Sequence, residues 1–251
     1  FGRGDERHLR PIRSAAGPLL VPIDRQTTEL VWSEHGYPSH AAYRDTHAKT
    51  EYEHKPWRND GGVYDAGAAA AQARKHAEDF VARAAERAAG DRLCVVAVDT
   101  ELLGHWWYEG PLWLRAVVEA CRESAVELVH LDDALAQVEP ADEPAAGLPV
   151  TSWGRDRDLS TWSGPQVADI AWAARAAELR AVAGAEDLSD AAVRELLALQ
   201  SSDWAFVVSE EFAAPYGHER SAHHRAALEA GGGDGPRSLA PAATAAPLLA
   251  P

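Results

Sequence analysis

The stretch LCVVAVDTELLGHWWYEGP, residues 93–111, decides the fold class of this 251-residue chain. Its first part, residues 93–98, is a short apolar run rich in β-branched side chains, which is typical of a buried strand. Asp99 follows directly, and catalytic groups in α/β proteins usually lie at the carboxyl ends of such strands. The stretch therefore predicts an α/β fold with a candidate active-site loop after the strand.

The loop carries two adjacent tryptophans, Trp106 and Trp107. Neighbouring side chains point in different directions, so both rings cannot face one core, and we expect one of them to face a cleft. Flat aromatic faces beside carboxylates suit a sugar, whose C–H faces stack on rings while its hydroxyl groups bond to acids. The alternative is a strand end capped by Asp99 or Thr100, followed by a tryptophan-rich turn in the core.

An alanine-rich helix is predicted before this strand, over residues 65–90. Asp65 is the expected N-cap and Gly90 the expected C-cap. Phe80 and Val81 define the face that we expect to be buried.

The stretch is followed by a second set of alternating patterns. Residues 111–123 predict a helix with Pro111 in its first turn, 126–130 a buried strand and 131–138 another helix. Residues 1–62 are rich in turn residues and predict loops carrying short strands. Strand, loop, helix, strand and helix in this order indicate a parallel sheet or barrel.

The pattern changes at residues 139–149, where prolines and acids indicate a linker. Beyond it, residues 165–184, 189–204 and 217–229 predict amphipathic helices, whereas the last residues have the composition of a disordered tail. We therefore expect a barrel part at 1–138, a linker at 139–149, a helical C-terminal domain at 150–229 and a tail at 230–251.

The composition limits the classes of partner that this protein is expected to bind. A net charge of −15 argues against nucleic acid or an acidic membrane as partner, because phosphate groups are bound by Lys and Arg. Cys94 and Cys121 fit neither a disulfide framework nor a metal spacing, and no histidine cluster has the H-E-x-x-H form, so no metal or cofactor is expected.

No apolar run approaches membrane-spanning length and no signal peptide is evident, which favours a cytoplasmic location. The absence of Met and the start at Phe1 predict that the chain begins within a larger enzyme.

The D-x-E-L-x-G-H-W-W pattern that opens at Asp99 resembles the fourth conserved region of glycoside hydrolase family 57, which contains 1,4-α-glucan branching enzymes and certain α-amylases. Three further stretches resemble the family in the same order. They are TTELVWSEHGYPSHAAYRD (27–45), TSWG (151–154) and LLALQSSDWAF (196–206), followed by Tyr216, Arg220 and His223. The resemblance implies the C-terminal part of an incomplete (β/α) barrel followed by an α-helical domain.

The resemblance makes Asp99 the catalytic acid/base, and we expect Trp106 and Trp107 to shield it from water. Retaining glycosidases also need a carboxylate nucleophile about 5–5.5 Å away. The family's nucleophilic glutamate belongs to a region that nothing here matches. Glu101 is more consistent with anchoring the loop. The chain by itself is therefore expected to be inactive.

Substrate contacts are also implied by the resemblance. For three of the implied residues a purely structural role is the alternative to contact with substrate. His105 is then a core histidine, Trp153 packs between two domains, and Asp203 is a solvent-exposed acid at a helix end. Ser39 replaces a glycine of the family's GYPG pattern, which alters a subsite. The expected substrate-binding residues are His105, Trp106, Trp107, Trp153, Asp203 and Ser39.

The leading hypothesis is a retaining 1,4-α-glucan branching enzyme of glycogen biosynthesis, which transfers a glucan segment to a 6-hydroxyl. The expected partner is an α-glucan such as maltodextrin, amylose or a glycogen-like polymer. An α-amylase or 4-α-glucanotransferase of the same family is the alternative enzyme. A non-catalytic glucan-binding remnant is the alternative from another class. The sequence leaves the oligomeric state open.

Overall fold

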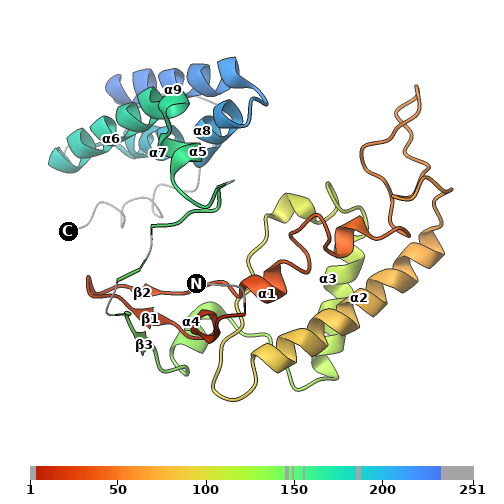
Figure 1. Cartoon of the computed structure of the whole chain (residues 1–251). Coiled ribbons are helices and arrows are strands. Elements are labelled where there is room, and N and C mark those ends of the chain that lie inside the picture. The colour runs from red at the N-terminus through yellow and green to blue at the C-terminus, as the bar shows by residue number, and fades with distance from the viewer. Residues whose placement is uncertain (1–3, 145–146, 149, 155, 185–187, 233–251) are drawn as a thin grey trace. The chain divides into compact units, whose positions relative to one another are not determined.

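The computed structural model describes residues 4–144, 147–148, 150–154, 156–184 and 188–232 (Figure 1). The chain divides into two compact units, residues 1–147 and 148–251, and each unit is described by itself. Both units are mainly helical, and the first also carries a small sheet.

The first unit contains two long helices and several short elements. In chain order the elements are η1 (Glu6–Leu9), β1 (Ile12–Arg13), β2 (Leu19–Leu20), α1 (Arg25–Thr28), η2 (Tyr37–Ser39), α2 (Ala66–Arg87), η3 (Thr100–Leu102), α3 (Gly110–Arg122), α4 (Leu131–Leu135) and β3 (Ala141–Asp142).

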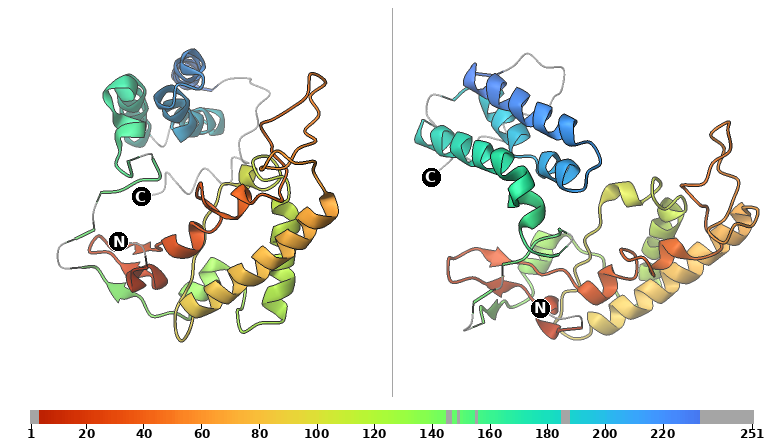
Figure 2. Two further views of the ribbon diagram at one scale, coloured as in Figure 1. Left: turned by 45° about the vertical axis from the view of Figure 1, so that its right-hand side comes forward. Right: turned by 45° about the horizontal axis from the view of Figure 1, so that its top comes forward.

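Helices α2 and α3 lie side by side and enclose the core of this unit (Figures 1 and 2). The Asp65 side chain caps α2 by accepting a hydrogen bond from the Ala68 amide, as the sequence predicts. Phe80 and Val81 are buried, also as predicted, and the Phe80 ring packs edge-on against Trp113 at 5.0 Å between centroids. Helix α2 ends at Arg87, so Gly90 lies beyond the cap, which is Ala88.

The sheet has the order β2-β1-β3, and each strand has two residues. Ile12 pairs antiparallel with Leu20 and parallel with Ala141. Strand β3 falls inside the stretch predicted to be a linker, so part of 139–149 belongs to the first unit instead. The division between the units, after residue 147, lies within the same stretch.

The predicted strands at 93–98 and 126–130 are wrong as secondary structure, because both segments are described and neither is a strand. Segment 93–98 has isolated backbone hydrogen bonds on two sides, from the Leu93 amide to the Leu9 carbonyl and from the Asp24 amide to the Val95 carbonyl. A strand requires a continuous ladder with a neighbour, but here Leu9 is the last residue of the helix η1 and Asp24 is the cap of α1, so neither bond continues into a ladder.

The second unit is built of helices, as the periodicity predicts (Figure 2). The predicted helix over 189–204 is interrupted, because Ser201 caps the start of a new helix by accepting from the Asp203 amide. All but three residues of the predicted tail at 230–251 lie outside the described residues. The elements are α5 (Ser160–Ser163), η4 (Pro165–Val167), α6 (Ala168–Ala183), α7 (Asp190–Leu199), α8 (Ser202–Ser209) and α9 (Ala214–Glu229).

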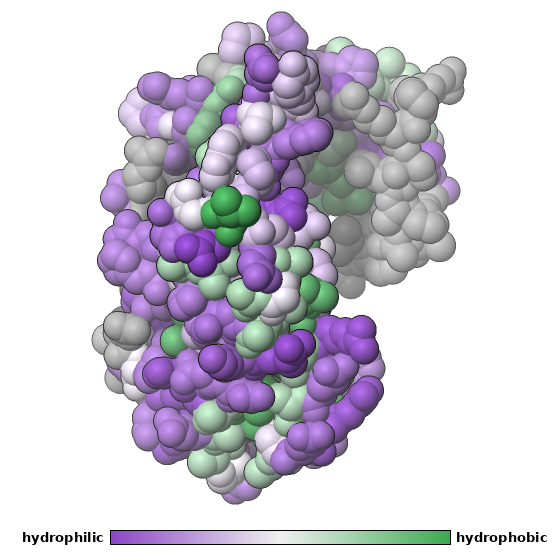
Figure 3. All heavy atoms as spheres, turned by 90° about the vertical axis from the view of Figure 1, so that its right-hand side faces the viewer, coloured by the Kyte–Doolittle hydropathy of each residue, from purple (hydrophilic) through white to green (hydrophobic). Residues whose placement is uncertain are grey.

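The surface is mostly hydrophilic on the face shown in Figure 3, with small scattered hydrophobic patches. Within the described part of the chain, no helix combines the length and the apolar character needed to cross a membrane.

Candidate active site

The motif loop, residues 99–109, connects segment 93–98 to helix α3 in the first unit. Asp99 is the N-cap residue of η3, but its side chain is exposed and makes no capping hydrogen bond. The alternative of a structural capping acid therefore loses its main support. The expectation that Trp106 and Trp107 shield Asp99 from water is wrong, because the carboxylate is exposed in this structure.

Two glycines allow the motif loop to fold tightly. Gly104 has a φ of +101°, a conformation that side-chain-bearing residues rarely adopt, and its amide donates to the Trp107 carbonyl at 2.8 Å. At Gly110, an added Cβ would lie 2.8 Å from the Cα of Leu103. The start of α3 and the beginning of the loop are therefore in direct backbone contact.

We expect Gly110→Ala to lower the free energy of unfolding by about 1–3 kcal/mol, the usual cost of overpacking a filled site. The new methyl group would meet backbone atoms of Leu103, which cannot rotate away. Thermal unfolding followed by circular dichroism measures the effect. Gly184→Ala is the control, because its Cβ would meet its nearest neighbour at an ordinary 3.6 Å. Equal unfolding temperatures for the two variants would contradict the close approach.

The side chains of the two adjacent tryptophans point in different directions, as predicted from the sequence. Trp106 is 46% exposed, and its indole nitrogen donates to the Glu101 carboxylate at 2.9 Å, which confirms the anchoring role expected for Glu101. Trp107 is only 1% exposed and lies between Tyr43 and Trp113, with ring centroids 5.3 and 5.2 Å away. Trp107 was expected to contact substrate, but its ring belongs to the core and offers no face to a sugar.

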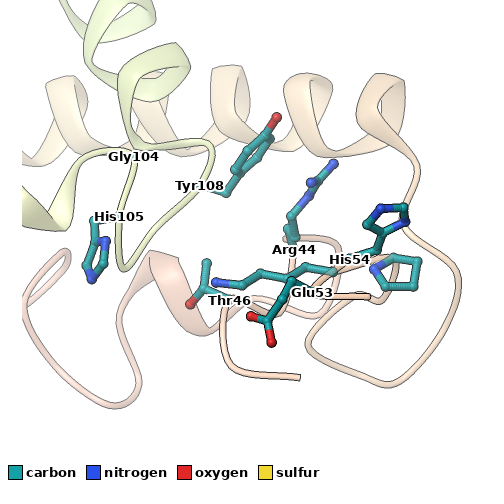
Figure 4. Close-up of a pocket in the computed structure, with 9 residues that line it drawn as sticks. Arg44, Thr46, Glu53, His54, Gly104, His105 and Tyr108 are labelled. Atoms are coloured by element: carbon teal, nitrogen blue, oxygen red, sulfur yellow. The ribbon is translucent and has the colours of Figure 1, made fainter. Parts of the chain in front are cut away.

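A hollow of about 550 Å³ lies between the motif loop and residues 44–56 (Figure 4). His105 lines it, so His105 is not a core residue, and His54 lies at the opposite end. The Thr46 hydroxyl donates to the Trp106 carbonyl at 3.1 Å and ties the two sides together. The residues lining the hollow are Arg44, Thr46, Glu53, His54, Lys55, Pro56, Gly104, His105 and Tyr108.

Arg44 and Glu109 form a buried connection beside this hollow that the sequence reasoning missed. The Glu109 side chain is fully buried, and its Oε1 accepts from the Arg44 amide at 3.3 Å. The Arg44 guanidinium carbon lies 4.2 Å from the ring centroid of Tyr64 and 4.0 Å from that of Tyr108. Burial, followed by the hydrogen bond to Glu109, raises the pKa of the Tyr64 hydroxyl. In the sequence, Arg44 is marked by its place near the end of the stretch 27–45 that resembles the family.

Ser39 is exposed at the end of η2, and the segment around it is fastened to α2. The Tyr37 hydroxyl donates to the Asp79 carboxylate at 2.5 Å, and the Tyr43 hydroxyl lies 2.8 Å from Nδ1 of His76. Burial, together with nearby His40, lowers the pKa of His76 to about 4. The imidazole is therefore neutral at pH 7, and its Nδ1 can accept a hydrogen bond from the Tyr43 hydroxyl.

Trp153 and Asp203 belong to the second unit, whereas the other predicted site residues belong to the first. Trp153 is 48% exposed in the loop before α5. Asp203 is exposed in the first turn of α8, where its carboxylate accepts from the Ser201 hydroxyl at 2.5 Å. Within the first unit, the structure brings His105 and Trp106 together, with ring centroids 4.9 Å apart.

Comparison with known proteins relates this geometry to one family. Residues 168–230 match the sequence profile described as 1,4-alpha-glucan branching enzyme, C-terminal. A probable 1,4-alpha-glucan branching enzyme of Mycobacterium tuberculosis is 35% identical over 94% of this chain and 52% of its own length. The chain thus spans about half the length of the curated relatives it matches.

Solved structures agree with the sequence comparison. The GH57-type branching enzyme from the archaeon Pyrococcus horikoshii superposes with a TM-score of 0.73 at 29% identity, covering 88% of this chain and 47% of that one. The GH57 branching enzyme from Thermococcus kodakaraensis, solved in complex with glucose, gives a TM-score of 0.73 at 30% identity, covering 88% and 45%. Sequence and fold together show that this chain belongs to glycoside hydrolase family 57.

Proposed function

We propose that this chain takes part in 1,4-α-glucan branching, in which an α-1,4 link is cleaved and the released segment is transferred to a 6-hydroxyl. The observation that carries the proposal is Asp99, an exposed acid without a capping role that opens the family's motif loop. Branching is favoured over hydrolysis because the relatives at about 30% identity or above are named branching enzymes.

Asp99 is the proposed acid/base. It would donate a proton to the departing glycosidic oxygen and later remove the proton from the acceptor 6-hydroxyl. Neither acid close to it in sequence fits the role of nucleophile. The Glu109 side chain is fully buried, and the Glu101 carboxylate accepts a hydrogen bond from Trp106. We therefore assign no nucleophile to this sequence.

The proposed substrate is an α-glucan such as maltodextrin, amylose or a glycogen-like polymer. In the first unit His105, Trp106 and Ser39 are the proposed contacts, since all three are accessible near the motif loop or in the GYPS segment. In the second unit the proposed contacts are Trp153 and Asp203, whose side chains are exposed.

We further propose that residues 1–138 form part of a (β/α) barrel. Two observations support this arrangement. Strands β1 and β3 run parallel, although they lie far apart in the sequence, and segment 93–98 forms backbone hydrogen bonds with the Leu9 carbonyl on one side and the Asp24 amide on the other. As part of the same proposal, the boundary between the two parts lies within the stretch 139–149 and precedes a helical domain at 150–229.

The test uses the protein expressed from its complete coding sequence, incubated with amylose. Branching is expected to create α-1,6 links, which proton NMR detects, with little increase in reducing ends. An increase in reducing ends without α-1,6 links would indicate an amylase. Redistributed chain lengths without new links would indicate a 4-α-glucanotransferase. Binding to amylose without any reaction would favour the non-catalytic remnant.

A further inference from the structure

The hollow between the motif loop and residues 44–56 extends the site beyond Asp99. Its volume of about 550 Å³ falls within the range typical of small-ligand sites. We propose that this hollow is an α-glucan subsite, in which Tyr108 carries a sugar ring and the polar groups of Thr46 and Lys55 bond to its hydroxyls. This inference rests on the proposed function and assigns it specific binding residues.

Tyr108 provides a ring of fixed orientation. It is 46% exposed, the Arg44 guanidinium packs 4.0 Å from its centroid, and Tyr64 meets it edge-on at 6.1 Å with an interplanar angle of 86°. A ring that is already held in place loses little side-chain entropy when a ligand stacks on it. Tyr108 is therefore prepared to pack against the C–H face of a sugar.

Glu109 holds the two sides of the hollow together. It follows Tyr108 in the motif loop, yet its carboxylate binds the amide of Arg44, which belongs to the facing segment. Its other oxygen, Oε2, makes no direct hydrogen bond among the described residues, so the hydrogen bond from the Arg44 amide to Oε1 is what ties the carboxylate to the facing segment. Glu109 is thus a positioning residue that acts through Arg44 and Tyr108.

The charges around the hollow favour a neutral ligand. Lys49 pairs with Glu53 at 2.6 Å. Hydrogen bonds from the Ala48 and His47 amides, with a smaller contribution from Lys55, lower the pKa of Asp45, so this carboxylate is ionised beside the lysine. Residues 44–56 and Glu109 together carry three positive groups, Arg44, Lys49 and Lys55, and four carboxylates, Asp45, Glu51, Glu53 and Glu109, so the positive charge is at least balanced.

Balanced charge and exposed hydroxyl and ring groups suit a neutral polyhydroxylated chain better than a phosphate, which would require a surplus of positive charge.

The experiment measures maltoheptaose binding by calorimetry in the protein expressed from its complete coding sequence. Tyr108→Ala is expected to raise the dissociation constant about tenfold, which corresponds to about 1.4 kcal/mol. Lys55→Gln changes a half-buried loop residue outside the core and is expected to raise the dissociation constant about threefold, as for the loss of one hydrogen bond. Tyr52→Ala is the matched control, because Tyr52 is 75% exposed on the same segment and does not line the hollow.

Three results would overturn the subsite. If both variants bind maltoheptaose as Tyr52→Ala does, while wild type still branches amylose, the subsite is wrong and the proposed function stands. If wild type neither binds maltoheptaose nor forms α-1,6 links, the proposed function itself fails. If inorganic phosphate binds wild type and this binding is lost in Lys55→Gln, the hollow is an anion site instead.

Discussion

Asp99→Asn is expected to reduce glucan transfer about 10²–10⁴-fold, the usual contribution of a general acid/base. The amide keeps the shape of the side chain but can neither donate nor accept the proton that the reaction moves. Because Asp99 is exposed and caps nothing, the substitution should leave the fold and the affinity for glucan nearly unchanged. Rates of α-1,6 link formation on amylose and maltoheptaose binding are the two measurements.

A donor with a better leaving group separates the catalytic role from a structural one. Glucosyl fluoride needs no proton to release fluoride, so it should partly bypass the defect in forming the intermediate. The matched control is Glu101→Gln, since Glu101 is the loop's anchoring acid through its bond to Trp106. Loss of glucan binding in Asp99→Asn, with no rescue by the fluoride, would show that Asp99 holds the loop and that the acid/base lies elsewhere.

Helices were predictable where local signals decide them. Asp65 caps α2 and Phe80 faces the core, because capping and 3.6-residue periodicity depend on residues close in sequence. That residues 93–98 do not form a strand was not predictable in the same way, since strand formation depends on neighbours that are remote in sequence, such as Leu9. The interruption at Ser201 had a local signal, an N-cap serine, which the continuous apolar periodicity of 189–204 concealed.

The site shows the same limit. Backbone geometry alone predicts that the adjacent side chains of Trp106 and Trp107 point in different directions, but which ring is buried depends on its packing against Tyr43 and Trp113. Nor could the sequence connect Glu109 with Arg44, which lie 65 positions apart. The motif identifies the loop that carries the chemistry, whereas tertiary packing decides which of its side chains reach solvent.

The largest expected loss of stability follows from removing the buried carboxylate of Asp24. Asp24 is fully buried and pairs with Arg87 at 2.6 Å, and it also caps α1 through the amide and hydroxyl of Thr27. Its own amide bonds to the Val95 carbonyl, so one residue joins α1, the end of α2 and the segment before the motif loop. Asp24→Ala leaves the Arg87 guanidinium, only 13% exposed, without its carboxylate.

Breaking such a pair is expected to cost about 3–5 kcal/mol of unfolding free energy, measured by urea denaturation. Glu119→Ala is the matched control in the same unit, because the ion pair between Arg115 and Glu119 is exposed and contributes at most about 1 kcal/mol. Equal midpoints for the two variants would mean that the buried pair contributes no more than a surface pair.

The same residue predicts a pH dependence that separates charge from shape. Burial opposes ionisation most strongly, but hydrogen bonds from Arg87 and Thr27 outweigh it, so the pKa of Asp24 lies below its ordinary 3.8. A lowered pKa in the folded state stabilises the protein above the unfolded-state value, and this contribution is lost as the pH falls through the folded-state pKa. The stability difference between wild type and Asp24→Asn should therefore be constant near neutral pH and narrow below about pH 3.8. A difference that stays the same down to pH 2 would show that shape and capping, not the charge on Asp24, stabilise this junction.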